Sequence, residues 1–183
     1  MASSVPSATL QGAVLIPDEF HSLPVHPLAV HGAVVLVPLA ALLAVLFVVP
    51  RTRAWAALPM PIVTVAALLS VIVSRASGYN FRDDLAKINP QIVEQIANHE
   101  DKATWLLYFM IVFAITAVGV YVLYRQAHRF TGAVEYAACG VLVVGALLVA
   151  WQTYQTGEAG SKVVWGGGGA SSTISQTVTV TGR

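Results

Sequence analysis

Histidine is the residue type in this sequence best suited to hold a metal ion or a cofactor. The chain contains five of them, His21, His26, His31, His99 and His128. Neutral imidazole binds zinc and copper, and it is a common axial ligand of haem iron. The sequence has no phosphate loop, no GxSxG, no HExxH and no dinucleotide fingerprint. Any chemistry of this chain therefore depends on which histidines the fold brings together.

The elements that must position these side chains are membrane helices. Apolar residues make up 56% of the chain and charged residues only 10%, whereas roughly a quarter of a typical soluble domain is charged. The formal net charge of +1, without a clustered basic patch, argues against nucleic acid as a partner. The single cysteine, Cys139, excludes a disulfide within the chain and a cysteine-based metal site.

Four apolar runs are long enough to cross a hydrocarbon core, which requires about 20 residues. They cover residues 29–49, 54–74, 103–124 and 133–153, and Glu135 is the only acidic or basic residue inside them. A chain in lipid must satisfy its backbone hydrogen bonds internally, so each run is expected to be a helix. The sequence predicts an all-α, four-helix transmembrane bundle with up-down topology over residues 29–165. A tail of residues 1–28 precedes it, and a flexible, glycine-rich tail of residues 166–183 follows it.

The connections between the runs predict how the bundle is oriented in the membrane. Two of them, residues 50–53 and 125–131, are very short and contain four arginines and no acid. Because Lys and Arg in short loops favour the cytoplasm, we expect both short connections there and both termini on the extracytoplasmic side. The long connection of residues 75–102 is expected to be a solvated loop over residues 77–84. It is then expected to start the third helix at Asn89 and Pro90.

With this topology, His31 and His99 are predicted to lie near one membrane depth on the outer side. His31 is about one turn inside the first span, and His99 is about one turn before the third. The fourth helix returns to that side with Thr156-Gly157-Glu158-Ala159-Gly160, and cofactor sites in bundles are built from such facing helices. Two histidines on two helices suit haem b. The basic residues available there to pair with the haem propionates are Arg75, Arg82, Lys102 and Lys162.

Other roles of these histidines stay open. His26, five residues before His31, is a second candidate for a ligand or for a neighbour of the haem edge. A zinc or copper site made from His26, His31, His99 and Glu158 is also consistent with imidazole chemistry. The structural alternative is that histidines near a membrane interface only form a hydrogen bond with a backbone carbonyl or a lipid headgroup.

Three segments carry a family resemblance. His26-Pro27-Leu28-Ala29-Val30-His31-Gly32 opens the first helix, His99 lies a few residues before Ala103, and residues 156–165 begin with Thr156-Gly157. These segments resemble the HPxxVHF-type opening, the start of the third helix and the TGxxGxxLVY-like ending of a bacterial membrane family, domain of unknown function 2231. Two positions differ, since Gly32-Ala33 stands where Phe-Pro is usual and Gly160-Ser161 replaces a glycine pair.

Members of that family occur alone and fused to Rieske iron–sulfur or c-type cytochrome domains. The resemblance implies a bacterial inner-membrane protein in an electron-transfer setting, with a redox or membrane-protein partner. We therefore expect a haem b held by His31 and His99, and no bond-making catalysis by the chain itself. The alternative is a cofactor-free accessory subunit of a larger, for example respiratory, membrane complex. A small transporter is disfavoured because the spans contain few polar residues and show no clear inverted repeat.

Overall fold

The structure is a computed structural model that describes residues 19–20, 23–88, 93–126, 128 and 130–165. Its long helices are α1 (Val25–Val48), α3 (Pro59–Ile88), α4 (Val93–Arg125) and α5 (Ala133–Trp165), and a one-turn helix, α2 (Arg53–Ala56), separates α1 from α3. A two-residue antiparallel pair, β1 (Glu19–Phe20) with β2 (Leu23–Pro24), precedes α1. The all-α architecture predicted from the sequence is confirmed.

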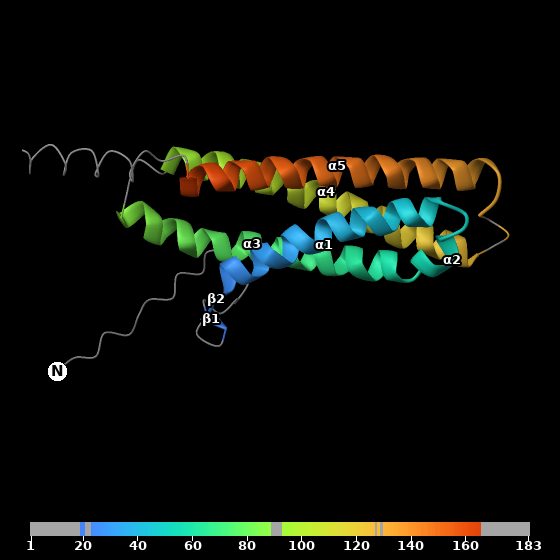
Figure 1. Ribbon diagram of the computed structural model, residues 1–183, viewed down its shortest axis with the longest axis horizontal. Coiled ribbons are helices and arrows are strands. Elements are labelled where there is room, and N and C mark those ends of the chain that lie inside the picture. The colour runs from blue at the N-terminus through green and yellow to red at the C-terminus, as the bar shows by residue number, and fades with distance from the viewer. Residues whose placement is uncertain (1–18, 21–22, 89–92, 127, 129, 166–183) are drawn as a thin grey trace, which may run out of the picture.

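The four long helices form an antiparallel bundle (Figure 1). α1 packs against α3 and α5, and α4 packs against the same two helices, so α1 and α4 lie at opposite corners. Successive long helices run in opposite directions, which is the predicted up-down topology. One end of the bundle, residues 23–33, 74–88, 93–104 and 152–165, is called the terminal end below. The opposite end, residues 46–60 and 120–139, is called the loop end.

Each long helix contains a stretch long and apolar enough to cross a membrane. These candidate spans are Leu28–Val48, Pro59–Gly78, Ile96–Arg125 and Ala133–Lys162. Large apolar side chains cover the outside of the bundle, as Val112, Ile115 and Leu147 show with exposures of 63%, 69% and 64%. Contiguous apolar surface of this kind is rare on soluble monomers, whereas acyl chains solvate it in a bilayer.

The helix of the second span begins at Pro59, later than residue 54, where the sequence pattern starts the apolar run. Residues 57–58 form a turn between α2 and α3. Proline has no backbone N–H to donate, and its fixed φ suits the first helical turn. Pro59 and Pro61 both lie in that first turn, where no intrahelical partner for an N–H exists. The chain therefore breaks before the prolines instead of running a helix through them.

At the terminal end, α3 is longer than the sequence pattern predicts. A loop is predicted over residues 77–84, but α3 continues to Ile88. Good helix formers such as Arg82, Leu85 and Lys87 outweigh poorer ones such as Gly78 and Asn80. The predicted helix start at Asn89 and Pro90 lies outside the described residues, and α4 is helical from Val93.

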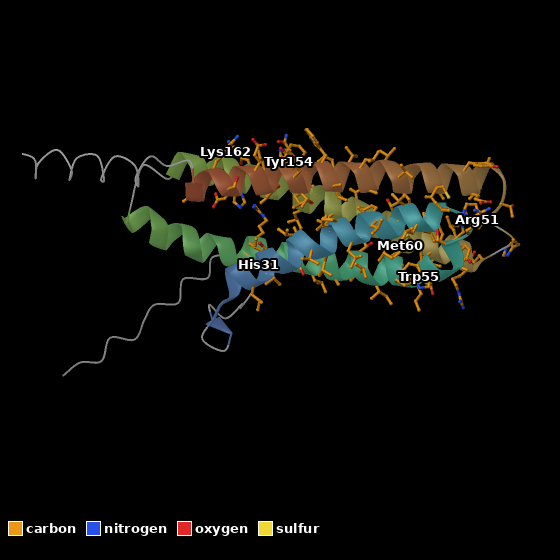
Figure 2. The ribbon with its side chains drawn as sticks, in the orientation of Figure 1. His31, Arg51, Trp55, Met60, Tyr154 and Lys162 are labelled. Carbon is orange, nitrogen blue, oxygen red and sulfur yellow. The ribbon has the colours of Figure 1, made fainter. Side chains whose placement is uncertain are left out.

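Because of their length, α4 and α5 project beyond the membrane. Each has 33 residues, which corresponds to about 50 Å, against about 30 Å for the hydrocarbon core. Exposed aromatic side chains mark the two interfaces, with Trp105, Trp151 and Tyr154 toward the terminal end and Trp55 and Tyr136 at the loop end. Figure 2 shows Tyr154 and Trp55 well separated along the bundle. The turns of α4 before Trp105 and of α5 after Tyr154 therefore lie at the headgroups or beyond them.

Arg53 connects the helices at the loop end. Its Nη1 donates a hydrogen bond to the Glu135 carboxylate of α5 at 2.5 Å. Its Nε and Nη2 donate to the backbone carbonyls of Phe47 and Val48, at the end of α1, at 3.1 and 3.2 Å. The guanidinium carbon lies 5.7 and 5.5 Å from the ring centres of Phe47 and Phe130. One side chain thus satisfies terminal carbonyls of α1 and compensates the only acid in the predicted spans.

Gly145 allows α5 to approach α4 closely. A Cβ atom at this position would lie 2.8 Å from Cδ2 of Phe113, whose ring is only 1% exposed. Gly140, on the same helix, is exposed, and a Cβ atom there would meet nothing within 4 Å. The two glycines therefore differ in what a methyl group would encounter.

We predict that Gly145→Ala lowers the free energy of unfolding by about 1–3 kcal/mol, because a methyl group would overlap the buried Phe113 ring and force it to shift. Gly140→Ala is expected to be neutral or to stabilise the protein by up to about 1 kcal/mol, because alanine favours helix. Thermal unfolding in detergent, followed by circular dichroism, compares the two variants. A Gly145→Ala protein as stable as Gly140→Ala would contradict the packing of α4 on α5.

We predict that Arg53→Gln destabilises the bundle by about 2–4 kcal/mol, because the Glu135 carboxylate loses its counter-charge next to the lipid. Arg53→Lys should retain part of the stability through the charge alone. Arg51→Gln, an exposed neighbour, is the matched control and should leave the unfolding midpoint in neutral detergent unchanged. Equal midpoints for the Arg53→Gln and Arg51→Gln proteins would show that the ion pair does not hold the loop end together.

Candidate functional site

A hydrogen bond orients His99 of α4 against α5. Nδ1 of His99 lies 3.2 Å from the backbone carbonyl oxygen of Thr156, and the side chain is half-buried. A carbonyl oxygen can only accept, so Nδ1 carries a proton, and in the neutral ring Nε2 keeps its lone pair. Binding one ring nitrogen to a carbonyl is how metal-ligating histidines are commonly oriented. A histidine with a purely structural role would make the same hydrogen bond to a carbonyl. The contact is therefore compatible with a ligand role and with a structural one.

Gly160 makes room for the His99 ring. A Cβ atom at Gly160 would lie 3.2 Å from Cε1 and 3.4 Å from Nδ1 of His99. Thr156 and Gly160 are four residues apart and so present the same face of α5 to α4. One turn further into the bundle, Nε2 of Gln152 donates to the backbone carbonyl of Lys102 at 3.0 Å. These contacts fix the register of α4 against α5 around the ring.

His31 belongs to the opposite corner of the bundle. It lies in the second turn of α1, and its side chain is exposed. Figure 2 shows it toward the terminal end, the same half of the molecule as Lys162. The next residue, Gly32, lies close to α3, since a Cβ atom there would be 3.1 Å from Oγ of Ser70. A group bound by His31 and His99 together would have to bridge two diagonal helices.

Glu158, another predicted site residue, does not lie on the side of α5 that contacts His99. Glu158 lies between Thr156 and Gly160 in the sequence, about half a turn around α5 from the face that meets His99. Its carboxylate accepts a hydrogen bond from Nζ of Lys162 at 2.7 Å in an exposed ion pair. Glu158 is therefore engaged with its own helix.

Three further predicted residues lie on α1 and α3. Arg75 of α3 is half-buried at the terminal end. His26 and Arg82 are within α1 and α3, but their side chains lie outside the described residues. Among the side chains that the structure does describe, no three His, Cys, Asp or Glu residues form a group that could hold a metal ion.

Two features of the molecule were missed by sequence reasoning. One is the contact between Gln152 and the Lys102 carbonyl. The other is the pairing of Arg53 with Glu135, which also brings Sγ of the buried Cys139 to 3.8 Å from Nη2 of Arg53. A sequence signal for this second feature existed, because an acid inside a predicted span requires a counter-charge, and the nearest basic residues by topology are the loop-end arginines.

Comparison with known protein families matches residues 22–173 to the family described as predicted membrane protein (DUF2231). The matched segment contains all five helices of the structure, together with His26, His31 and His99. No significant match is found among curated proteins or among solved structures.

We predict that neutral His99 is the tautomer protonated at Nδ1, because the Thr156 carbonyl oxygen accepts from that nitrogen. Two-bond ¹H–¹⁵N correlation spectra of protein labelled at histidine report the tautomer directly, and the spectrum of His99→Gln assigns the resonance. Gly160→Ala should change the same signal, because a methyl group would press on the ring. A His99 protonated at Nε2 would contradict the contact with Thr156.

Proposed function

This chain belongs to the DUF2231 family of predicted membrane proteins, and from that premise we propose that it binds haem b and passes electrons between partners at the membrane. His99 and His31 are the proposed axial ligands. The observation that carries the proposal is the hydrogen bond from Nδ1 of His99 to the Thr156 carbonyl, because it leaves Nε2 oriented and able to bind iron.

The described residues fit such a ligand at His99. Its ring is half-buried between α4 and α5, where the absence of a side chain at Gly160 accommodates the ring itself. His31 supplies a second imidazole from α1, which lies diagonally opposite α4. When bound, haem supplies reversible one-electron chemistry at its iron. The chain itself would contribute the two nitrogens and the orientation of at least one of them.

Basic side chains at the terminal end support the binding of an anionic porphyrin. Arg75 lies on α3 and Lys102 on α4, three residues after His99. Arg82 is in the same helix as Arg75, although its side chain lies outside the described residues. Cations of this kind pair with carboxylates such as the haem propionates.

We also propose that the protein lies in the inner membrane of a bacterium with both termini on the extracytoplasmic side. The support is the sequence of the loop end, where four arginines occupy two short connections. With this orientation His31 and His99 face the extracytoplasmic side. A redox partner would then approach from outside the cytoplasm.

The second candidate is a cofactor-free accessory subunit of a larger membrane complex. The exposure of His31 favours it, because a ligand of a buried group would be expected to face the bundle interior. The His99 contact with a carbonyl also satisfies that ring without a metal. In this case the projecting turns of α4 and α5 would serve as a docking surface for a neighbouring subunit.

Visible spectra decide between these functions. The wild type, His31→Ala and His99→Ala are purified in detergent from haem-replete cells, and spectra are taken oxidised and after dithionite reduction. We expect the wild type to show a Soret band and, after reduction, sharp α and β bands. All of these bands should be lost in either variant. His128→Ala, at the loop end, is the matched control and should keep the wild-type spectrum.

Each other outcome has a defined meaning. A colourless wild type overturns the haem proposal and leaves the accessory subunit, whose partners mild-detergent purification would then identify. Loss of the bands in His99→Ala but not in His31→Ala would remove His31 as a ligand and direct the test to His26.

A further inference from the structure

The loop end contains arginines in two different environments. Arg53 is enclosed, with a side chain only 16% exposed, and it is paired with Glu135. Arg51, between α1 and α2, and Arg125, in the last turn of α4, are exposed. Within the described part of the chain, neither of these two guanidinium groups forms a hydrogen bond or an ion pair.

The charge of the loop end is therefore uncompensated. The sequence has no acidic residue between Glu19 and Asp83, and Glu135 is the only one between Asp101 and Glu158. Because Arg53 already binds Glu135, no acid remains in these two stretches to balance Arg51 and Arg125. An anion from outside the chain is the partner that this surface lacks.

Exposed aromatic residues place the same surface at the membrane interface. Trp55 of α2 and Tyr136 of α5 are 65% and 79% exposed, and Figure 2 shows Arg51 and Trp55 at the same end of the bundle. Indole and phenol rings favour the boundary between acyl chains and headgroups. The two free cations thus lie at the depth where lipid phosphates lie.

We propose that Arg51, Arg125 and Trp55, which all lie at the loop end, bind the headgroups of anionic phospholipids. The guanidinium groups donate hydrogen bonds to the phosphate diester, and Trp55 contacts the glycerol and the upper acyl chain. A free phosphate ion would use the two arginines but would gain nothing from the exposed indole, so the surface fits a lipid better. This inference does not depend on whether haem is bound.

The test compares lipid binding by four proteins. The wild type, Arg51→Gln/Arg125→Gln, Arg51→Lys/Arg125→Lys and Lys162→Gln are titrated with phosphatidylglycerol and with phosphatidylcholine, and native mass spectrometry counts the bound lipids. Each basic side chain near an anionic surface contributes roughly fivefold in affinity, so the double glutamine variant should lose phosphatidylglycerol affinity about 25-fold. The double lysine variant should lose less. Lys162→Gln, an exposed cation at the terminal end, should bind as the wild type does.

Equal phosphatidylglycerol affinity in the wild type and the double glutamine variant would overturn the proposal. An equal loss in Lys162→Gln would also overturn it, because the effect would then follow total charge and not this surface. Displacement of phosphatidylglycerol by inorganic phosphate at similar concentration would assign the arginines to a free anion. The unfolding midpoint in phosphatidylcholine, expected to match the wild type, verifies that each variant is folded. The single variants Arg51→Gln and Arg125→Gln replace the double one if it does not fold.

Discussion

The need to satisfy polar groups without water governs this structure. In lipid, an unpaired backbone or side-chain group costs several kcal/mol, so polar side chains must find partners within the bundle. Hydroxyl groups in the spans do so by donating to the carbonyl one turn earlier on their own helix, as in the pairs Thr64–Met60, Thr116–Val112 and Thr153–Val149. Arg53 and Glu135 solve the same problem for charge. The remaining contacts between the long helices are mainly apolar and are set by shape, as Gly145 and Phe113 show.

The two ends of the bundle use their polar groups differently. At the loop end, each of the three guanidinium nitrogens of Arg53 donates a hydrogen bond, to a carboxylate or to a backbone carbonyl, and the group lies near two aromatic rings. At the terminal end, His99 and Gln152 each make one contact with a backbone carbonyl across the helix pair. Nε2 of neutral His99 keeps a lone pair that can accept a hydrogen bond or bind a metal ion, whereas a guanidinium has no such lone pair. The Arg53 cluster therefore has a structural role, whereas His99 has one ring nitrogen that no hydrogen bond described above engages.

The composition was enough to predict four spanning helices, because lipid leaves the backbone few alternatives. Two boundaries of the second long helix were predicted wrongly from the apolar pattern. Local residue preferences set them, since α3 begins at Pro59 and continues beyond Gly78. Contacts across the bundle depend on how each helix is rotated about its axis, and apolar runs without a strong polar face do not encode that rotation. The exposure of His31 and the contact between His99 and Thr156 could not be predicted for this reason. The pairing of Arg53 with Glu135 could have been inferred from charge alone, because Glu135 had so few possible partners.

The separation of Arg53 and Glu135 along the chain has a consequence for biogenesis. The two residues are 82 positions apart. Arg53 lies in the connection between α1 and α3, whereas Glu135 lies in the first turn of α5. During synthesis, the hairpin of α1 and α3 is complete before Glu135 leaves the ribosome. At that stage Arg53 has no Glu135 to pair with. The ion pair can form only when the second hairpin has inserted and closed on the first. The ion pair thus joins the first half of the chain to the second, and a chain that stops before α5 lacks it.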